Sequence, residues 1–142
     1  PMMVHRIYDR KNSKLQAIEL LNKVGLDGNF YNRFPHELSG GQRQRVVIAR
    51  ALAMNPEFIV CDESVSALDV SVQAQVLNLL NDLKEEFNLS YLFISHDLAV
   101  VKYTSDRVIV LNKGNLVESE TSEILFSHPK NSYTQELISS GF

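Results

Sequence analysis

Two adjacent glycines stand where the sequence predicts a helix to begin. Gly40 and Gly41 follow Ser39, and the next residues as far as Met54 are rich in helix formers. Ser39 and Gln42 have the spacing of a capping box. The free N–H groups and positive dipole of a helix start attract anions, and glycines let a ligand approach the backbone closely. The pattern indicates a phosphate site, although an ordinary capped helix shows the same short string.

A pair of carboxylates follows an apolar run further along the chain. Phe58 to Cys61 contains no polar alternation, which is typical of a strand buried on both faces of a parallel sheet, and Asp62 and Glu63 come directly after it. Ligands of α/β proteins bind at the carboxyl ends of such strands. Asp62 can hold Mg²⁺ through water, and Glu63 can accept a proton from an attacking water. A strand that runs out into solvent is the alternative.

A histidine follows a second apolar run. Tyr91 to Ile94 predicts another buried strand, and His96 lies just beyond it, at the sheet edge where Asp62 and Glu63 are expected. Its imidazole can donate a hydrogen bond to a phosphate oxygen, although a lone histidine at a strand end is more often a plain surface residue. Cys61 fits a small core hydrophobe better than a nucleophile.

Helices and strands alternate along the sequence, which predicts an α/β fold with a mainly parallel sheet. The predicted helices cover residues 14–24, 39–54, 72–87, 98–103 and 133–139. The predicted strands cover residues 58–61, 91–94, 107–111 and 116–119. A turn at 112–115 joins the last two strands as an antiparallel hairpin.

Composition limits the classes of function. The chain has 142 residues, of which 44% are hydrophobic and 22% charged, values typical of a soluble globular domain. A net charge of -3 argues against nucleic-acid binding, and a single cysteine excludes an intrachain disulfide framework. No apolar run approaches the roughly 18 residues that cross a bilayer, so no direct membrane insertion is expected.

Four segments together resemble the ATP-binding subunits of ABC transporters. Leu38 to Gln42 is similar to the signature motif of that family, Phe58 to Glu63 to its Walker B motif, Ser66 to Asp69 to its D-loop, and His96 to its H-loop histidine. The four segments match in order and spacing. The resemblance implies part of an ABC-type P-loop NTPase domain, with the helical subdomain and the back half of the nucleotide-binding sheet.

Finer strings resemble the oligopeptide and dipeptide importer subfamily. They are Phe34 to Glu37 ahead of the signature, Val65 to Gln73 around the D-loop, and the tail from His128 to Thr134. In the tail, Asn131 and Ser132 stand where the subfamily has His-Pro. Ser64 stands where most relatives have proline after the glutamate.

The P-loop pattern G-x-x-x-x-G-K-[ST] occurs nowhere in the sequence, and the chain opens on Pro1 rather than methionine. We therefore expect the C-terminal half of a longer ATPase subunit, inactive by itself. Its three expected parts are a portion of the helical subdomain (1–55), the back half of the nucleotide-binding core (56–120) and a C-terminal extension (121–142).

The resemblance implies a role for each motif residue. Asp62 assists Mg²⁺, Glu63 is the general base for the hydrolytic water, and His96 steadies the γ-phosphate of ATP. Asp69 lies at the subunit interface and links the two composite sites. The signature residues contact ATP held by the opposite subunit; they are Ser39, Gly40, Gly41 and Gln42.

The implied partners are a second ABC ATPase subunit, identical or related, and transmembrane permease subunits. The implied location is cytoplasmic, on the inner face of the membrane. Two other interpretations stay open. One is a truncated, non-catalytic half-subunit that acts as an interaction module. The other is the ABC-type head of a DNA-maintenance protein, which the acidic balance and the missing heptads disfavour.

Overall fold

The computed structural model describes residues 9–141. The first eight residues of the expected 1–55 segment lie outside that range. The chain forms two compact units, one that ends at Leu92 and one that begins at Phe93, and each is described by itself. Among residues 9–141, no helix combines the length and the apolar character needed to cross a membrane.

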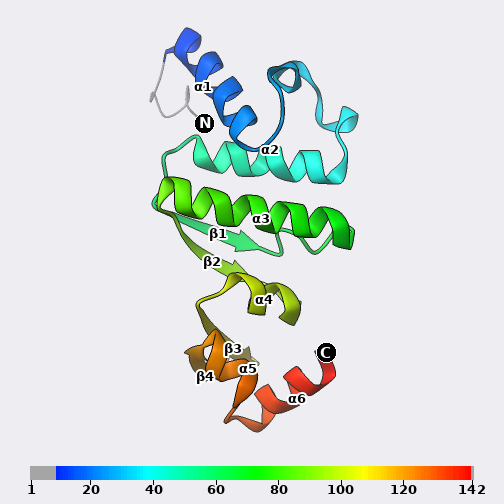
Figure 1. Ribbon diagram of the computed structural model, residues 1–142, viewed down its shortest axis with the longest axis vertical. Coiled ribbons are helices and arrows are strands. Elements are labelled where there is room, and N and C mark those ends of the chain that lie inside the picture. Colours follow the sequence, from blue (N-terminus) through cyan, green and yellow to red (C-terminus); the bar gives the residue numbers. More distant parts are fainter. Residues whose placement is uncertain (1–8, 142) are drawn as a thin grey trace. The chain divides into compact units, whose positions relative to one another are not determined.

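In the first unit, α-helices stack over one face of a sheet (Figure 1). Helix α1 packs against α2, and α2 packs against α3. Strands β1 and β2 are neighbours in one sheet and point the same way, joined by α3 as the crossover. The elements are α1 (Arg10–Lys23), two 3₁₀ helices (Gly28–Asn32 and Pro35–Glu37), α2 (Gly40–Leu52), β1 (Phe58–Asp62), α3 (Val70–Phe87) and β2 (Ser90–Ile94), whose last residues cross into the second unit.

The core of the first unit lies between the facing sides of the helices. Its buried apolar residues recur at helical spacing, as an amphipathic face requires; they include Leu21, Val24, Ile48, Leu52, Val76, Leu80 and Leu83. The α1–α2 junction is closed by Arg45, whose Nη1 donates to the Val24 carbonyl oxygen at 2.8 Å. Gly25 has a φ of 74°, and a Cβ there would lie 2.9 Å from that Nη1. The positive φ therefore favours glycine where α1 ends.

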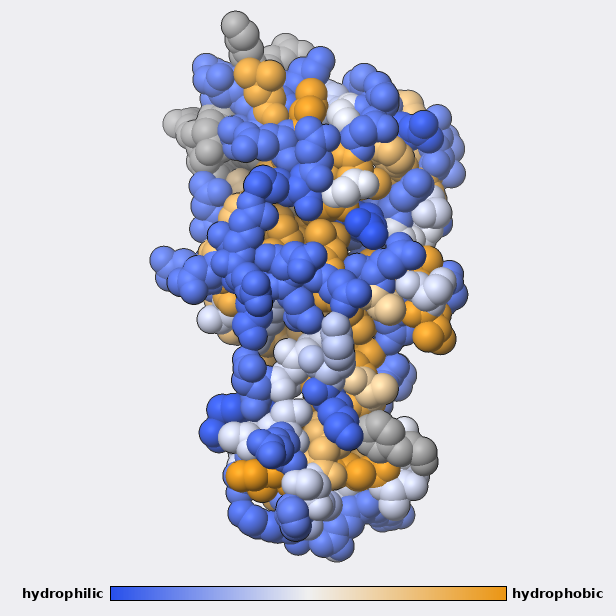
Figure 2. All heavy atoms as spheres, viewed as in Figure 1, coloured by the Kyte–Doolittle hydropathy of each residue, from blue (hydrophilic) through white to orange (hydrophobic). Residues whose placement is uncertain are grey.

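The prediction that both apolar strands are buried on both faces is wrong. Phe58 and Val60 are each 54% exposed, and Leu92 is 46% exposed. Tyr91, on the opposite face of β2, turns toward α3, and its hydroxyl donates to the Leu80 carbonyl oxygen at 3.1 Å. Within the described residues, helices cover one face of this sheet, so successive residues alternate between burial and exposure. Hydrophobic side chains are also visible at the surface among hydrophilic ones in Figure 2.

The second unit contains the predicted antiparallel hairpin. Its elements are α4 (Leu98–Thr104), β3 (Arg107–Asn112), β4 (Asn115–Thr121), α5 (Ser122–Ser127) and α6 (Ser132–Gly141). Arg107 pairs with Thr121 at the open end of the hairpin. Lys113 and Gly114 both have positive φ, 50° and 79°, as a tight two-residue hairpin turn requires. Helix α5 was not predicted from the sequence.

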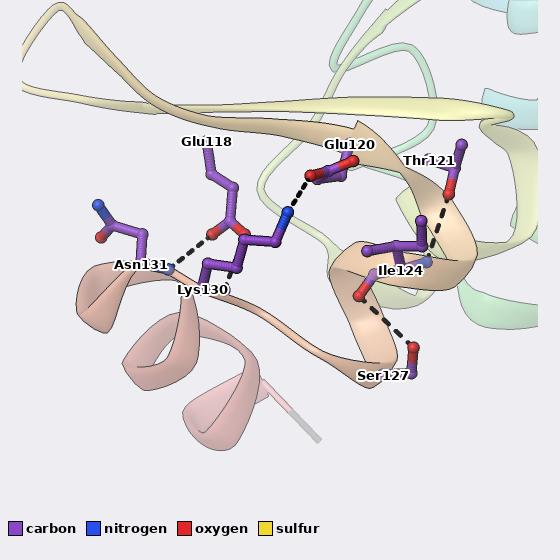
Figure 3. A network of polar contacts seen from close by, with 7 residues as sticks. All are labelled: Glu118, Glu120, Thr121, Ile124, Ser127, Lys130 and Asn131. Carbon is purple, nitrogen blue, oxygen red and sulfur yellow. Dashed lines mark hydrogen bonds and ion pairs between the residues drawn. The ribbon is translucent and has the colours of Figure 1, made fainter.

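A buried carboxylate ties α6 to the hairpin (Figure 3). Glu118 of β4 is 7% exposed and accepts the backbone N–H groups of Lys130 at 2.8 Å and Asn131 at 3.1 Å. The backbone N–H of Lys130 and the Thr134 side chain hold the pKa of Glu118 below its usual value. The Lys130 ammonium group forms an ion pair with Glu120.

Candidate functional site

The capping box at the start of α2 has the predicted form. The Ser39 hydroxyl accepts the backbone N–H of Gln42 at 3.3 Å, and the Gln42 side-chain oxygen accepts the backbone N–H of Ser39 at 3.0 Å. Ser39 and Gly40 are exposed, and Gly41 and Gln42 are half-buried. The helix therefore presents an accessible, positively polarised end that can bind a phosphate group.

The two glycines at this helix start have different surroundings. A Cβ on Gly40 would meet Leu68 Cδ2 at 3.4 Å, an ordinary contact, whereas a Cβ on Gly41 would meet Val72 Cγ1 at 2.5 Å. Leu68 and Val72 lie on either side of Asp69 in the sequence. The structure thus brings the signature-like and D-loop-like segments of one chain together.

Asp69 is the N-cap of α3. Its carboxylate accepts the backbone N–H of Val72 at 3.0 Å and the hydroxyl of Ser71 at 2.8 Å. These two hydrogen bonds lower the pKa of Asp69, so its negative charge is held at the positive end of the helix. Asp69 therefore has a structural role that the sequence interpretation had not assigned to it.

The two carboxylates lie where β1 ends. Asp62 is the last residue of the strand, Glu63 follows it, and both are exposed. Glu63 has a φ of 45°, a left-handed conformation that is uncommon for a residue other than glycine or asparagine. The backbone carbonyl oxygen of Glu63 accepts the backbone N–H of Ser66 at 3.2 Å and the Ser66 hydroxyl at 3.0 Å. Ser66 thereby holds the turn that carries Glu63, a contact that sequence reasoning missed.

Cys61 is inert in this setting. Its thiol is buried, and burial raises its pKa to about 11, although the neighbouring Ser64 side chain opposes part of that shift. Because the thiolate is the reactive form, Cys61 stays a protonated core residue near neutral pH.

His96 belongs to the second unit, in the connection between β2 and α4. Its side chain is exposed. The next residue, Asp97, caps α4 by accepting the backbone N–H groups of Ala99 at 2.9 Å and Val100 at 3.2 Å. His96 therefore lies directly before the N-cap residue of α4.

Residues 9–141 contain no group of three or more His, Cys, Asp or Glu side chains that could hold a metal ion. Mg²⁺ does not need such a group, because it is commonly bound by one or two carboxylates together with substrate phosphates and water. A single exposed carboxylate at the end of a parallel strand, Asp62, fits that mode of binding.

Comparison with known proteins identifies similar sequences and structures. The family model described as "ABC transporter" matches residues 2–66. The oligopeptide transport ATP-binding protein AppF of Bacillus subtilis is 54% identical over 140 residues, which cover 99% of this chain and 43% of that protein. Along nearly its whole length, the chain is therefore similar to an ATP-binding protein of a transporter.

Two further proteins are similar to the chain in sequence or structure. The dipeptide transport ATP-binding protein DppF of Lactococcus lactis is 55% identical over 125 residues, 88% of this chain and 40% of that protein. An ATP-binding cassette of an ABC transporter, solved in its ADP conformation, has a TM-score of 0.77 and 28% identity, with 92% of this chain and 52% of that chain covered. The chain thus spans about two-fifths of the curated ABC relatives' length and has the fold of part of an ABC-type P-loop NTPase domain.

Proposed function

We propose that this chain belongs to an ATP-hydrolysing subunit of an ABC transporter that powers the uptake of oligopeptides or dipeptides. The observation that carries the proposal is 54% identity to an oligopeptide transport ATP-binding protein along 99% of the chain. The partners would be a second ABC ATPase subunit, identical or related, and transmembrane permease subunits. Through them the protein would lie on the cytoplasmic face of the membrane.

The carboxylates at the end of β1 would serve the hydrolysis. Glu63 would accept the proton of the attacking water, and its exposure and fixed turn suit a base that must reach a bound substrate. Asp62 would assist the Mg²⁺ that accompanies ATP and neutralises phosphate charge. His96 would donate a hydrogen bond to the γ-phosphate and so steady it.

The start of α2 would bind the nucleotide of the opposite subunit. The Ser39 hydroxyl, the backbone at the exposed Gly40 and the half-buried Gly41, and the Gln42 amide would approach the γ-phosphate in trans. Asp69 would lie at the subunit interface. Its hydrogen bonds at the start of α3 fix the position of its charged carboxylate. Two such composite sites would form in each pair of subunits.

The 142-residue polypeptide by itself would not hydrolyse ATP. Its sequence contains no P-loop, whose backbone amides and lysine hold the phosphates in P-loop enzymes. We propose that the chain divides into three parts, residues 1–55, 56–120 and 121–142. Calorimetry tests whether the polypeptide binds ATP by itself. Saturable micromolar binding of ATP would contradict the proposal that it is inactive by itself.

Peptide uptake tests the proposed function. Cells that lack the gene carrying this sequence would fail to take up labelled di- and oligopeptides. The wild-type gene would restore uptake, and the Glu63→Gln variant would not. A Glu57→Gln variant is the matched control, because that exposed side chain precedes the other end of β1. Normal peptide uptake in the deletion strain, with loss of another solute, would overturn the assignment of peptides.

A further inference from the structure

The start of α2, which carries the signature-like motif, packs closely against the start of α3, which follows the D-loop-like motif. A Cβ on Gly41 would lie 2.5 Å from Val72 Cγ1, closer than carbon atoms can approach without a shift. The backbone of Gly41 is an ordinary helical one, without a positive φ. Alanine otherwise suits helical backbone better than glycine.

The obstacle at this contact is a rigid one. Valine in a helix has one strongly preferred side-chain rotamer, so Cγ1 of Val72 cannot easily turn away. The backbone of Val72 is also fixed, because its N–H donates to the Asp69 carboxylate at 3.0 Å. Helices α2 and α3 pack against each other beside this contact.

From these contacts we infer that Val72 is a positioning residue for the signature segment. Its Cγ1 methyl group occupies the space beside Gly41 and so sets where Ser39 and the start of α2 lie relative to Asp69. The glycine at 41 is then required by packing inside the same subunit. Gly40 differs, because a Cβ there would meet Leu68 Cδ2 at 3.4 Å, and it is free of this constraint. This inference rests on the proposed function for its effect on ATP.

A compensating pair of substitutions tests the inference. In Val72→Ala the obstructing methyl group is gone, and the Cβ of residue 72 lies 3.8 Å from the added Cβ at 41, an ordinary contact. We therefore compare Gly41→Ala, Val72→Ala, the double variant and Gly40→Ala in the full-length protein that carries this sequence. The readouts are the thermal unfolding midpoint and, well below that temperature, kcat and KM for ATP.

Gly41→Ala should lower the unfolding midpoint and raise KM by about tenfold or more, because misplaced binding groups cost affinity steeply. The double variant should return to within about twofold of Val72→Ala in KM. Gly40→Ala should leave the unfolding midpoint unchanged. Any change in KM caused by Gly40→Ala should be the same when Gly40→Ala is combined with Val72→Ala. A residue that only stabilised the fold would leave KM unchanged at that temperature.

A double variant whose KM stays as high as that of Gly41→Ala would overturn the inference, since the side chain at 41 would then obstruct the nucleotide itself. If the wild-type protein does not hydrolyse ATP, the proposed function fails separately. The unfolding midpoints then decide: recovery in the double variant supports the contact with Val72, and additive losses contradict it.

Discussion

The carboxylate of Glu118 accepts the backbone N–H of Lys130 at 2.8 Å, which fixes the segment that leads into α6. Its second oxygen accepts the next N–H, that of Asn131, at 3.1 Å. One acidic side chain of β4 thus satisfies two backbone donors at the start of a helix. Residues near the C-terminus are held to the hairpin by this carboxylate.

Glu118→Gln should therefore lower the thermal unfolding midpoint. An amide has one acceptor oxygen, so one of the two backbone donors would lose its partner. Glu136→Gln, an exposed change of the same kind on α6, is the control and should leave the midpoint unchanged. Equal midpoints for the two variants would show that the Glu118 contacts do not stabilise the protein.

The same contacts predict a dependence of stability on pH. Hydrogen bonds lower the pKa of Glu118 in the folded protein. Its ionised form therefore contributes fully to the stability of the fold above the ordinary pKa of 4.5. That contribution is lost as the pH falls through the lower folded pKa. Urea unfolding should be measured from pH 6 to pH values below 4.5. Over that range the wild-type protein should lose more stability than Glu118→Gln. Parallel curves would contradict the prediction.

Glu63→Asn should stabilise the fold while it removes hydrolysis. Asparagine adopts the left-handed conformation more readily than glutamate, so relief of the strain at a φ of 45° should add up to about 1 kcal/mol. Glu57→Asn is the control, because Glu57 does not have a positive φ. Chemical denaturation measures both variants. A destabilised Glu63→Asn would show that the conformation of Glu63 carries no strain.

The isolated 142-residue chain should self-associate through its uncovered sheet face. Val60 and Leu92 are exposed there, and such apolar surface promotes association. Light scattering at high concentration should show oligomers, which the double variant Val60→Lys/Leu92→Lys should reduce. Leu15→Lys, at an exposed leucine of α1, should have no such effect. A monodisperse wild-type monomer would refute the prediction.

Mixed dimers can locate the site that the signature serves. In full-length subunits, pairing Gly40→Asp with Glu63→Gln should leave one composite site intact, because a signature acting in trans puts both lesions in the other site. The aspartate would place a negative charge beside the γ-phosphate. Both lesions on one subunit, paired with wild type, should damage both sites. Higher ATP hydrolysis in the second arrangement would show that the signature acts in cis.

Features set by neighbouring residues were predictable from the sequence. The capping box of Ser39 and Gln42 and the hairpin turn at Lys113 and Gly114 both have the predicted form, because their geometry depends on residue types a few positions apart. Helix α5 was not predicted from the sequence. Its local signals were the N-cap Thr121, whose hydroxyl accepts the backbone N–H of Ile124 at 3.4 Å, and the acidic Glu123 in its first turn.

Features set by distant residues were not predictable. The pattern of Phe58 to Cys61 indicates an apolar strand, but which face is covered depends on the helices that pack against it. The glycine at 41 was recognised as unusual, yet its contact with Val72 depends on how α2 lies on α3. Likewise, Glu118 resembles any acidic residue of a strand until Lys130 and Asn131 are placed against it.

The most direct test of the proposed function is ATP hydrolysis by the full-length protein with Glu63→Gln. The amide keeps the shape of the glutamate but cannot accept the proton of water, so the rate should fall by roughly 10²–10⁴-fold. ATP-dependent pairing of subunits, measured by size-exclusion chromatography, should remain. Glu57→Gln should hydrolyse ATP at the wild-type rate. A Glu63→Gln variant that hydrolyses ATP as fast as wild type would contradict the assignment of Glu63 as the general base.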